Sequence, residues 1–584
     1  MNLRKQYWLL LAALFCLPVS AILAQEKQPE VAEESAKGEE TEPAAEEGEG
    51  ENAGQAKLDE ATDLKITARN PADLAKVIKA CEEAIKLGLD EGNTQLANKV
   101  LAGTALQRAK ILLQGMPRVL SNPRALRGLR DEVLKDLNRA TKADAKLAEA
   151  YVLGAQLEML PPPGNRKKAL EKINKGVELL EDDKLKSSAL LLRATLREND
   201  KERLEDLDAA IDSNSENVQA WQAKLALLQA GGRFEEMLAG AEKLLDQDSE
   251  NQFALQAVIQ ALMNLEKSEA IIDLMSERIE ETPDNNAFYR IRAQAYIMAE
   301  ESEKAIEDLN KALEINDSDH QSLVMRGQIY FDDGEIEKAN RDISDALLIE
   351  PNSLRGVVMR SLVAAREERY GDAISDMELL VRNQPNNPGW VMQLASYYQM
   401  DDRPRKAIAL LSELVKRDPK NTQAIRLRGD ARLAISEHKA AVADYEQAIK
   451  VMEESAGDSP VDDRDYSGAL NNLAWVLATS SKDEIRDGKK SVEYGLKACE
   501  LTDYKEAHIL STLAAGYAEN GDFENARKWA AKAVEVGEAE TPPNPQVDQL
   551  KEELESYKKD KPWREDQETP ENEKPLTNED TIDT

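Results

Sequence analysis

Four arginines recur through the middle of the chain at one position of a repeating pattern, and an aspartate follows each of them after the same interval. The pairs are Arg292 with Asp308, Arg326 with Asp342, Arg360 with Asp376, and Arg428 with Asp444. Such a row of guanidinium groups could bind an anionic ligand or a phosphopeptide, because arginine donates paired hydrogen bonds to carboxylates and phosphates. If each arginine instead faces its own aspartate, the row belongs to the scaffold.

The way in which the two positions vary favours the scaffold interpretation. In the copy between Arg360–Asp376 and Arg428–Asp444, the arginine is replaced by Leu394 and the aspartate by Leu410. Two copies depart from this rule, Leu190 with Asp206 and Lys224 with Gly240. Because the arginine and the aspartate are mostly gained or lost together, we interpret each pair as a salt bridge between two helices of one repeat. The anion track is the alternative.

The pairs belong to a repeat of 34 residues. One position is always alanine: Ala305, Ala339, Ala373, Ala407 and Ala441. A second small position precedes it, at Ala293, Gly327, Ser361, Ala395 and Gly429, and tyrosine follows that position at Tyr296, Tyr330 and Tyr398. Proline closes the unit at Pro283, Pro351, Pro385 and Pro419. Small residues permit close helix approach and proline ends a helix, so each unit is predicted to be two antiparallel helices joined by a polar turn.

Small residue, tyrosine, alanine and terminal proline at this period resemble the tetratricopeptide repeat. The resemblance is clean from Trp221 to Ala448, and looser copies extend it to about ten clear units over Ala150–Gly537. It implies an all-α, right-handed superhelical solenoid of antiparallel helix pairs, flanked here by disordered acidic tails. It also implies a protein that binds other proteins and is not an enzyme.

In this family the first helix of each unit lines the concave side and contacts the partner. The resemblance therefore implies a groove of the following residues: Phe253, Gln256, Gln260, Met263, Arg290, Gln294, Ile297, Met298, Gln328, Phe331, Arg355, Leu362, Arg366, Met392, Gln399, Met400 and Arg426. Glutamine, flexible methionine and four arginines suit an adaptable surface for an acidic and apolar peptide. Some relatives clamp a chaperone's terminal carboxylate with lysine and asparagine, but the corresponding sites here hold Ile291, Met325 and Met359.

The composition divides the chain into six predicted segments. They are a signal peptide at 1–24, cleaved near Ala21 or Ala24; a disordered acidic linker at 25–60; irregular helical repeats at 61–149; the repeat array at 150–540; a closing helix at 541–563; and a disordered acidic tail at 564–584. In the closing helix, Leu550, Leu554 and Tyr557 are predicted to cover the last repeat, with Trp563 folding back.

The N-terminus has the composition of an export signal. Arg4 and Lys5 precede an apolar run over Tyr7–Leu17, which Pro18 ends. The prediction is an exported protein, periplasmic or secreted, and the alternative is an uncleaved membrane anchor. The two remaining cysteines, Cys81 and Cys499, stand at opposite ends of the array, so we expect two small core residues and no disulfide.

Charge and histidine content exclude several functions. A net charge of −35 disfavours nucleic acid as a partner. His320, His438 and His508 lack metal-ligand spacing, and the sequence predicts no catalytic residue, no metal and no cofactor. We therefore expect a non-catalytic scaffold for another protein or peptide, with no integral membrane span after signal cleavage. Alternatives are an assembly factor that recruits partners through its tails or convex face, and a self-associating structural element.

Overall fold

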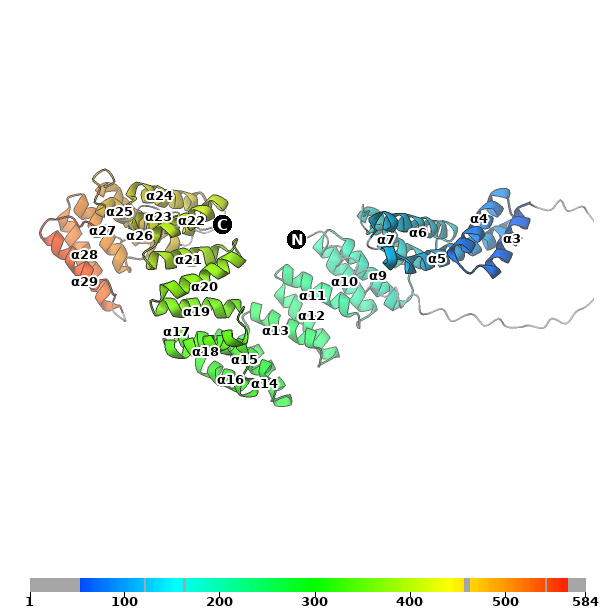
Figure 1. Ribbon diagram of the computed structural model, residues 1–584, viewed down its shortest axis with the longest axis horizontal. Coiled ribbons are helices and arrows are strands. Elements are labelled where there is room, and N and C mark those ends of the chain that lie inside the picture. The colour runs from blue at the N-terminus through cyan, green and yellow to red at the C-terminus, as the bar shows by residue number, and fades with distance from the viewer. Residues whose placement is uncertain (1–52, 120–121, 161–163, 456–462, 541–543, 566–584) are drawn as a thin grey trace, which may run out of the picture. The chain divides into compact units, whose positions relative to one another are not determined.

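The computed structural model describes residues 53–119, 122–160, 164–455, 463–540 and 544–565, and every regular element within them is a helix (Figure 1). The predicted signal peptide, most of the acidic linker and most of the C-terminal tail lie outside these residues. Among the described helices, none combines the length and the apolar character needed to cross a membrane.

The chain divides into two units, Met1–Lys267 and Ser268–Thr584, each of which is described by itself. The first unit contains α3 (Ala53–Thr67), α4 (Pro71–Leu87), α5 (Glu91–Gln114), the 3₁₀ turn η1 (Met116–Val119), α6 (Pro123–Ala143), α7 (Ala148–Glu158), α8 (Arg166–Leu179), α9 (Asp183–Leu196), α10 (Asp200–Ser213), α11 (Val218–Ala230), α12 (Phe234–Gln247) and α13 (Gln252–Asn264). Consecutive helices pack against one another along this unit.

The second unit continues the same plan. It contains α14 (Ser268–Glu281), α15 (Asn286–Met298), α16 (Ser302–Ile315), α17 (His320–Asp332), α18 (Ile336–Ile349), α19 (Leu354–Arg366), α20 (Tyr370–Asn383), α21 (Pro388–Met400), α22 (Pro404–Arg417), α23 (Thr422–Ala434), α24 (His438–Ser455), α25 (Asp463–Thr479), α26 (Gly488–Leu501), α27 (Ala507–Glu519), α28 (Phe523–Ala539) and α29 (Val547–Lys558). From α15 to α28 the helices form successive pairs, and we call the two members of a pair the first and second helix.

Each first helix in the regular part of the array begins at a side chain that caps it. The caps recur at the repeat period, as Asn217, Asn251, Asn285, Asp319, Ser353, Asn387 and Asn421. Each side-chain oxygen accepts a hydrogen bond from a backbone N–H of the first turn, for example from Ala424 at 2.9 Å. Such a cap stabilises a helix by about 1 kcal/mol. The terminal proline of the unit lies two residues before the cap, so it ends one helix just ahead of the next.

The turn inside each pair is also fixed by one residue per repeat. Positive φ angles recur at Gly232, Glu266, Glu300, Gly334, Glu368, Asp402 and Ser436. A left-handed conformation costs a residue with a side chain about 1–2 kcal/mol, and glycine much less. Only two of these seven positions hold glycine, so the remaining turns are held in this conformation by the packing of the helices on either side.

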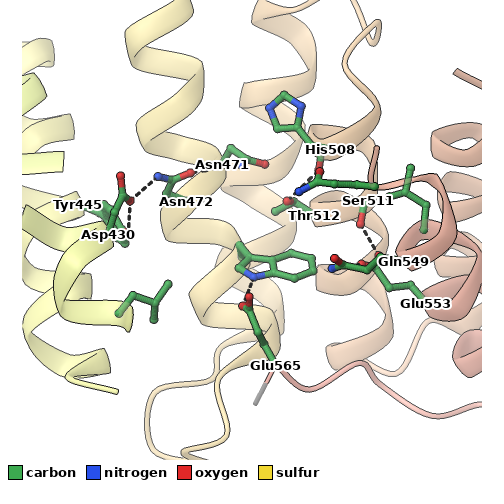
Figure 2. Close-up of a pocket in the computed structure, with 14 residues that line it drawn as sticks. Asp430, Tyr445, Asn471, Asn472, His508, Ser511, Thr512, Gln549, Glu553 and Glu565 are labelled. Carbon is green, nitrogen blue, oxygen red and sulfur yellow. Dashed lines mark hydrogen bonds between the residues drawn. The ribbon is translucent and has the colours of Figure 1, made fainter. Parts of the chain in front are cut away.

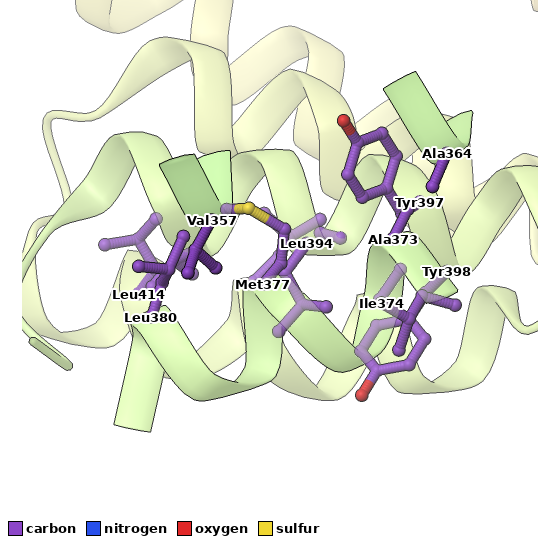
Figure 3. Packing of buried hydrophobic residues seen from close by; sticks show 14 of the residues in the cluster. Val357, Ala364, Ala373, Ile374, Met377, Leu380, Leu394, Tyr397, Tyr398 and Leu414 are labelled. Atoms are coloured by element: carbon purple, nitrogen blue, oxygen red, sulfur yellow. The ribbon is translucent and has the colours of Figure 1, made fainter. Parts of the chain in front are cut away.

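The core lies between the paired helices, where the small positions of the repeat meet large side chains. The five alanines from Ala305 to Ala441 are fully buried. At Gly429 an added Cβ would lie 2.7 Å from the ring of Tyr445, which explains why the position is small. Figure 3 shows one stretch of this core, in which Met377, Leu380 and Leu394 pack together.

The N-terminal boundary of the folded part differs from the prediction. Residues 53–60 were assigned to the disordered linker, but they form the first half of α3. The reason is an apolar face within the acidic sequence: Leu58 is buried against Ala84 and Ala97. The high content of acidic residues in this segment hides the short apolar periodicity in the sequence.

The last helix, α29, packs on the final pair of helices. In α29, Leu550 and Tyr557 are buried, and Leu554 and Trp563 pack beside them on the end of the last pair. The predicted tail boundary at 564 is too early, because Arg564 forms an ion pair of 2.6 Å with Glu519. The chain therefore continues across α27 after the helix has ended.

Both cysteines in the described residues are free and fully buried, each within its own unit. Burial raises the pKa of the Cys81 thiol to about 11 and that of the Cys499 thiol to about 12. Since the thiolate is the reactive form, both side chains behave as small core residues.

Candidate partner-binding face

The structure brings all four predicted arginine–aspartate pairs together, each between the first and the second helix of a pair. Arg326 on α17 donates from Nε and Nη2 to the two carboxylate oxygens of Asp342 on α18, at 2.7 and 2.8 Å. The other three pairs have the same geometry, with donor–acceptor distances of 2.6–3.0 Å. The hydrogen bonds to Asp342 raise the pKa of Arg326, because they stabilise its charged form.

Two of these arginines, Arg326 and Arg292, also contact the helix that precedes their own pair. Arg326 Nη1 donates to Asn310 Oδ1 at 2.6 Å, and Arg292 Nη1 donates to Ser276 Oγ at 2.9 Å. Each of these two guanidinium groups therefore holds its own second helix and the second helix before it. Since each of the four guanidinium groups is bound to an aspartate of the scaffold, the geometry favours the scaffold interpretation of the arginine row over the anion track.

Sequence reasoning missed the arginine partners of one further carboxylate of this type. Asp206 has no arginine at the usual interval, but Arg193 and Arg197 reach it, with hydrogen bonds at 2.9 and 3.1 Å from their Nε atoms. Arg193 lies on α9, about one turn past Leu190, which holds the usual arginine position, and Arg197 is the residue that caps the C-terminus of α9. An arginine shifted by one turn on the same helix face was the signal that could have revealed the pair.

The predicted groove residues all lie on first helices or their equivalent, and none is buried. In the first unit they are Phe253, Gln256, Gln260 and Met263 on α13. In the second unit they are Arg290, Gln294, Ile297 and Met298 on α15; Gln328 and Phe331 on α17; Arg355, Leu362 and Arg366 on α19; Met392, Gln399 and Met400 on α21; and Arg426 on α23. We refer to the second-unit set as the first-helix face.

The four arginines of the first-helix face differ in their surroundings. Arg290 forms an ion pair with buried Asp319, which also caps α17. Arg426 lies 3.8 Å from Asp430, one turn further along α23. Arg355 and Arg366, at the two ends of α19, are exposed, and within the described residues neither has a carboxylate at ion-pair distance. The two arginines of α19 are therefore the ones available to a partner.

The first-helix face ends in a cavity of about 340 Å³ near the C-terminus. We call it the C-terminal cavity, and Figure 2 shows the residues around it. It is lined by Asp430, Leu433, Tyr445, Asn471, Asn472, Trp475, His508, Ser511, Thr512, Gln546, Gln549, Leu550, Glu553 and Glu565. They come from α23, α24, α25, α27 and α29, from Gln546 at the N-terminal cap of α29, and from the segment that follows α29.

One side of the C-terminal cavity is built around Asp430. Its Oδ1 accepts hydrogen bonds from Tyr445 Oη at 2.6 Å and from Asn472 Nδ2 at 2.8 Å (Figure 2). Burial raises the pKa of Asp430, and these hydrogen bonds and the charge of Arg426 oppose that effect.

The opposite side is built around Glu553 of the closing helix, a carboxylate that is 1% exposed. Glu553 accepts hydrogen bonds from Ser511 Oγ and, at 3.0 Å, from Gln549 Nε2. Burial raises its pKa, and the nearby charge of Glu565 raises it further. Glu565 in turn accepts a hydrogen bond from the indole N–H of Trp475.

The sequence did not predict this cavity, although the cavity continues the first-helix face beyond the predicted groove residues. Asp430 lies one helical turn beyond Arg426, the last predicted groove residue, and so shares its side of α23. The predicted groove ends at Arg426 because the 34-residue period breaks after it. Helix α24 runs to Ser455, and a long turn, Ser480–Asp487, separates α25 from α26. Carrying the same helix face forward into α25 and α27 would have identified Asn471 and Ser511.

The described residues contain no group of three or more His, Cys, Asp or Glu side chains placed to hold a metal ion. Of the histidines, His438 is buried, with Nδ1 3.0 Å from Ser480 Oγ, and burial lowers its pKa.

Residues 392–460 match the family model of the tetratricopeptide repeat. This segment of the chain is a tetratricopeptide repeat. This match lies over α21 to α24, the part in which the cap and the small positions recur, and the all-α solenoid predicted from the sequence is confirmed. A search of curated proteins finds no match to the chain.

Solved structures of other repeat proteins are similar to the chain at low identity. Yeast Tom70 is 16% identical, with 78% of this chain and 96% of that chain covered and a TM-score of 0.36. YrrB, described as a tetratricopeptide-repeat protein with an unusual peptide-binding site, is 18% identical over 31% of this chain and 93% of its own, with a TM-score of 0.29. The C-terminal part of a repeat protein from Cytophaga hutchinsonii is 16% identical, covering 43% and 96%, with a TM-score of 0.35.

Proposed function

We propose that the chain is a non-catalytic scaffold that is exported and holds a segment of a partner protein along the first-helix face. The observation that carries this proposal is the contrast between two sets of arginines. Those of the repeating pairs are engaged inside the scaffold, whereas Arg355 and Arg366 are exposed. Tetratricopeptide repeats are commonly used in this way, and the stacked first helices offer an extended surface to a segment of another chain.

The chemistry of the face favours a segment with both acidic and apolar residues. Ile297, Met298 and Met400 are exposed large apolar side chains, at 36%, 37% and 56% of their full area. Methionine adapts its shape to a partner, and an exposed arginine can donate two parallel hydrogen bonds to a carboxylate. An acidic residue of the partner opposite α19, flanked by apolar residues, would use both features.

The test is charge reversal on α19 in the full chain. A partner is first identified by affinity capture from an extract of the exporting cells, and its binding is then measured by calorimetry. We expect Arg355→Glu with Arg366→Glu to weaken binding about tenfold to a hundredfold, because two attractive contacts become repulsive. The melting temperature of the protein should stay unchanged, since neither arginine takes part in the scaffold.

A matched control carries the same change of charge on second helices. Arg341 on α18 and Arg382 on α20 are exposed, so Arg341→Glu with Arg382→Glu alters the net charge equally but leaves α19 intact. Equal loss of binding in both variants would point to the second-helix side and to an assembly factor that recruits partners by that face. Self-association of the full chain, with no other protein captured, would favour a structural element.

A further inference from the structure

We propose that the C-terminal cavity binds a cationic side chain, the ammonium group of lysine or the guanidinium group of arginine, carried by the segment that lies along the first-helix face. The inference deepens the proposed function and rests on it for the source of the side chain. The cavity itself is defined by residues that are separate from Arg355 and Arg366, so the two can be tested apart.

The charges around the cavity call for a cation. Asp430, Glu553 and Glu565 line it, and the lining residues include no lysine and no arginine. Arg426 forms a long ion pair of 3.8 Å with Asp430. Glu553 is buried, and the side chains that hydrogen-bond to it, Ser511 and Gln549, carry no positive charge, so a cation in the cavity would reduce the cost of burying its carboxylate.

A second feature points the same way. Asn471 is only 9% exposed, and within the described part of the chain no donor reaches its side-chain oxygen, although its amide group donates to Asn472 Oδ1 at 3.4 Å. Asn471 lines the cavity from α25 and is drawn in Figure 2. An unsatisfied buried acceptor costs about 1–3 kcal/mol, so a ligand that supplies N–H donors would satisfy it.

The cavity is suited to an organic cation and not to a metal ion. Its carboxylates are spread over α23, α29 and the segment after α29, and the described residues form no cluster close enough to hold a metal. The volume of about 340 Å³ lies at the lower end of the range of small-ligand pockets. Several hydrogen-bond acceptors spaced around such a volume match the separate N–H donors of an ammonium or guanidinium group.

The apolar part of the lining suits the stem of such a side chain. Leu433 and Leu550 contribute aliphatic surface, and Trp475 contributes an indole ring. Lysine and arginine bury their methylene groups against apolar walls, and both cations are attracted to the face of an indole ring. The position of the cavity at the end of the first-helix face would let one basic residue anchor one end of the bound segment.

The test uses the full chain labelled with ¹⁵N at tryptophan, and N-acetyl-lysine methylamide as the probe. The indole signal of Trp475 is assigned with Trp475→Phe, and that of Trp529, which stacks on Tyr504 away from the cavity, is the internal reference. We expect a saturable shift of the Trp475 signal, with a dissociation constant on the order of 1 mM for a single side chain. N-acetyl-norleucine methylamide, which lacks the charge, should cause no saturable shift.

Two variants on the closing helix test whether the probe binds in the cavity itself or is attracted only by the overall negative charge of the protein. Glu553→Gln should weaken the response to the lysine probe about tenfold or more, while its melting temperature stays equal or rises, because a buried charge has been removed. Glu552→Gln changes the net charge equally on an exposed neighbour and should bind the probe within about twofold of the natural chain. Equal responses to the lysine and norleucine probes, or equal losses in both variants, would overturn the proposal.

Cadaverine distinguishes a side chain from a free amine. A free diamine that binds more than about tenfold tighter than the lysine probe would overturn the assignment to a partner segment. Binding of these small probes is measured in the absence of the partner protein. If the probes fail while charge reversal on α19 still abolishes partner binding, the cavity assignment fails and the proposed function stands; the opposite pattern would overturn the function and leave a cation site.

Discussion

Replacing Arg326 with leucine is expected to destabilise the α17–α18 pair by about 3–5 kcal/mol. The reason is Asp342, which is 4% exposed and would remain buried without its two hydrogen bonds from the guanidinium group. A stranded buried charge costs more than the pair contributes. Native-state hydrogen exchange of the full chain measures this loss locally, since each pair of a repeat array opens partly on its own.

The companion variant is Arg326→Leu with Asp342→Leu, which should recover most of the lost stability. The chain already contains this solution in another copy, where Leu394 is buried and Leu410 takes the aspartate position. Arg341→Leu, an exposed arginine on α18, is the control and should change little. If the two single losses simply add in the double variant, the arginine and the aspartate act independently and the salt-bridge interpretation fails.

Replacing Tyr557 with alanine is expected to cost about 3–5 kcal/mol and to detach the closing helix. Tyr557 is fully buried beneath α29 and packs with Ala526, Ala530 and Trp563 on the end of the last pair. A terminal repeat whose apolar face is uncovered loses the neighbour that its stability depends on. Exchange of the α27 and α28 amides, compared with those of α17 and α18, would measure the local effect.

The matched substitution Tyr557→Phe should be neutral or stabilise the closing helix by about 1 kcal/mol. The Tyr557 hydroxyl is buried and finds no hydrogen-bond partner among the residues that the structure describes, so removing it removes an unsatisfied group and leaves the packing intact. A loss from Tyr557→Phe as large as that from Tyr557→Ala would show that the hydroxyl, and not the ring, holds the helix.

The regular part of the fold could be predicted because one physical demand recurs in every copy. A buried alanine such as Ala373 leaves room for the neighbouring helix, and proline such as Pro385 ends the helix before it. The capping residues recur just as strictly, but asparagine is common in polar turns and did not stand out. The left-handed turn residues were also missed, because residues such as Glu300 have no conformational preference for that position.

The candidate site was less predictable, because the decisive contacts lie outside one repeat. Sequence spacing placed Arg290 and Arg355 on the same side of their helices, but it did not reveal that Arg290 forms an ion pair with Asp319 of the next repeat. In the C-terminal cavity, Glu553 reaches Ser511 from a helix that is not part of any repeat. Contacts of this kind follow from how helices stack, and a periodicity within the repeat does not encode them.

The central claim, that a partner lies along the first-helix face, is tested most directly by hydrogen exchange of the full chain with and without the captured partner. The account predicts slower exchange on binding in α15, α17, α19, α21 and α23, with little change in the second helices α16, α18, α20 and α22. Protection confined to the second helices, or found only in segments outside the array, would contradict it.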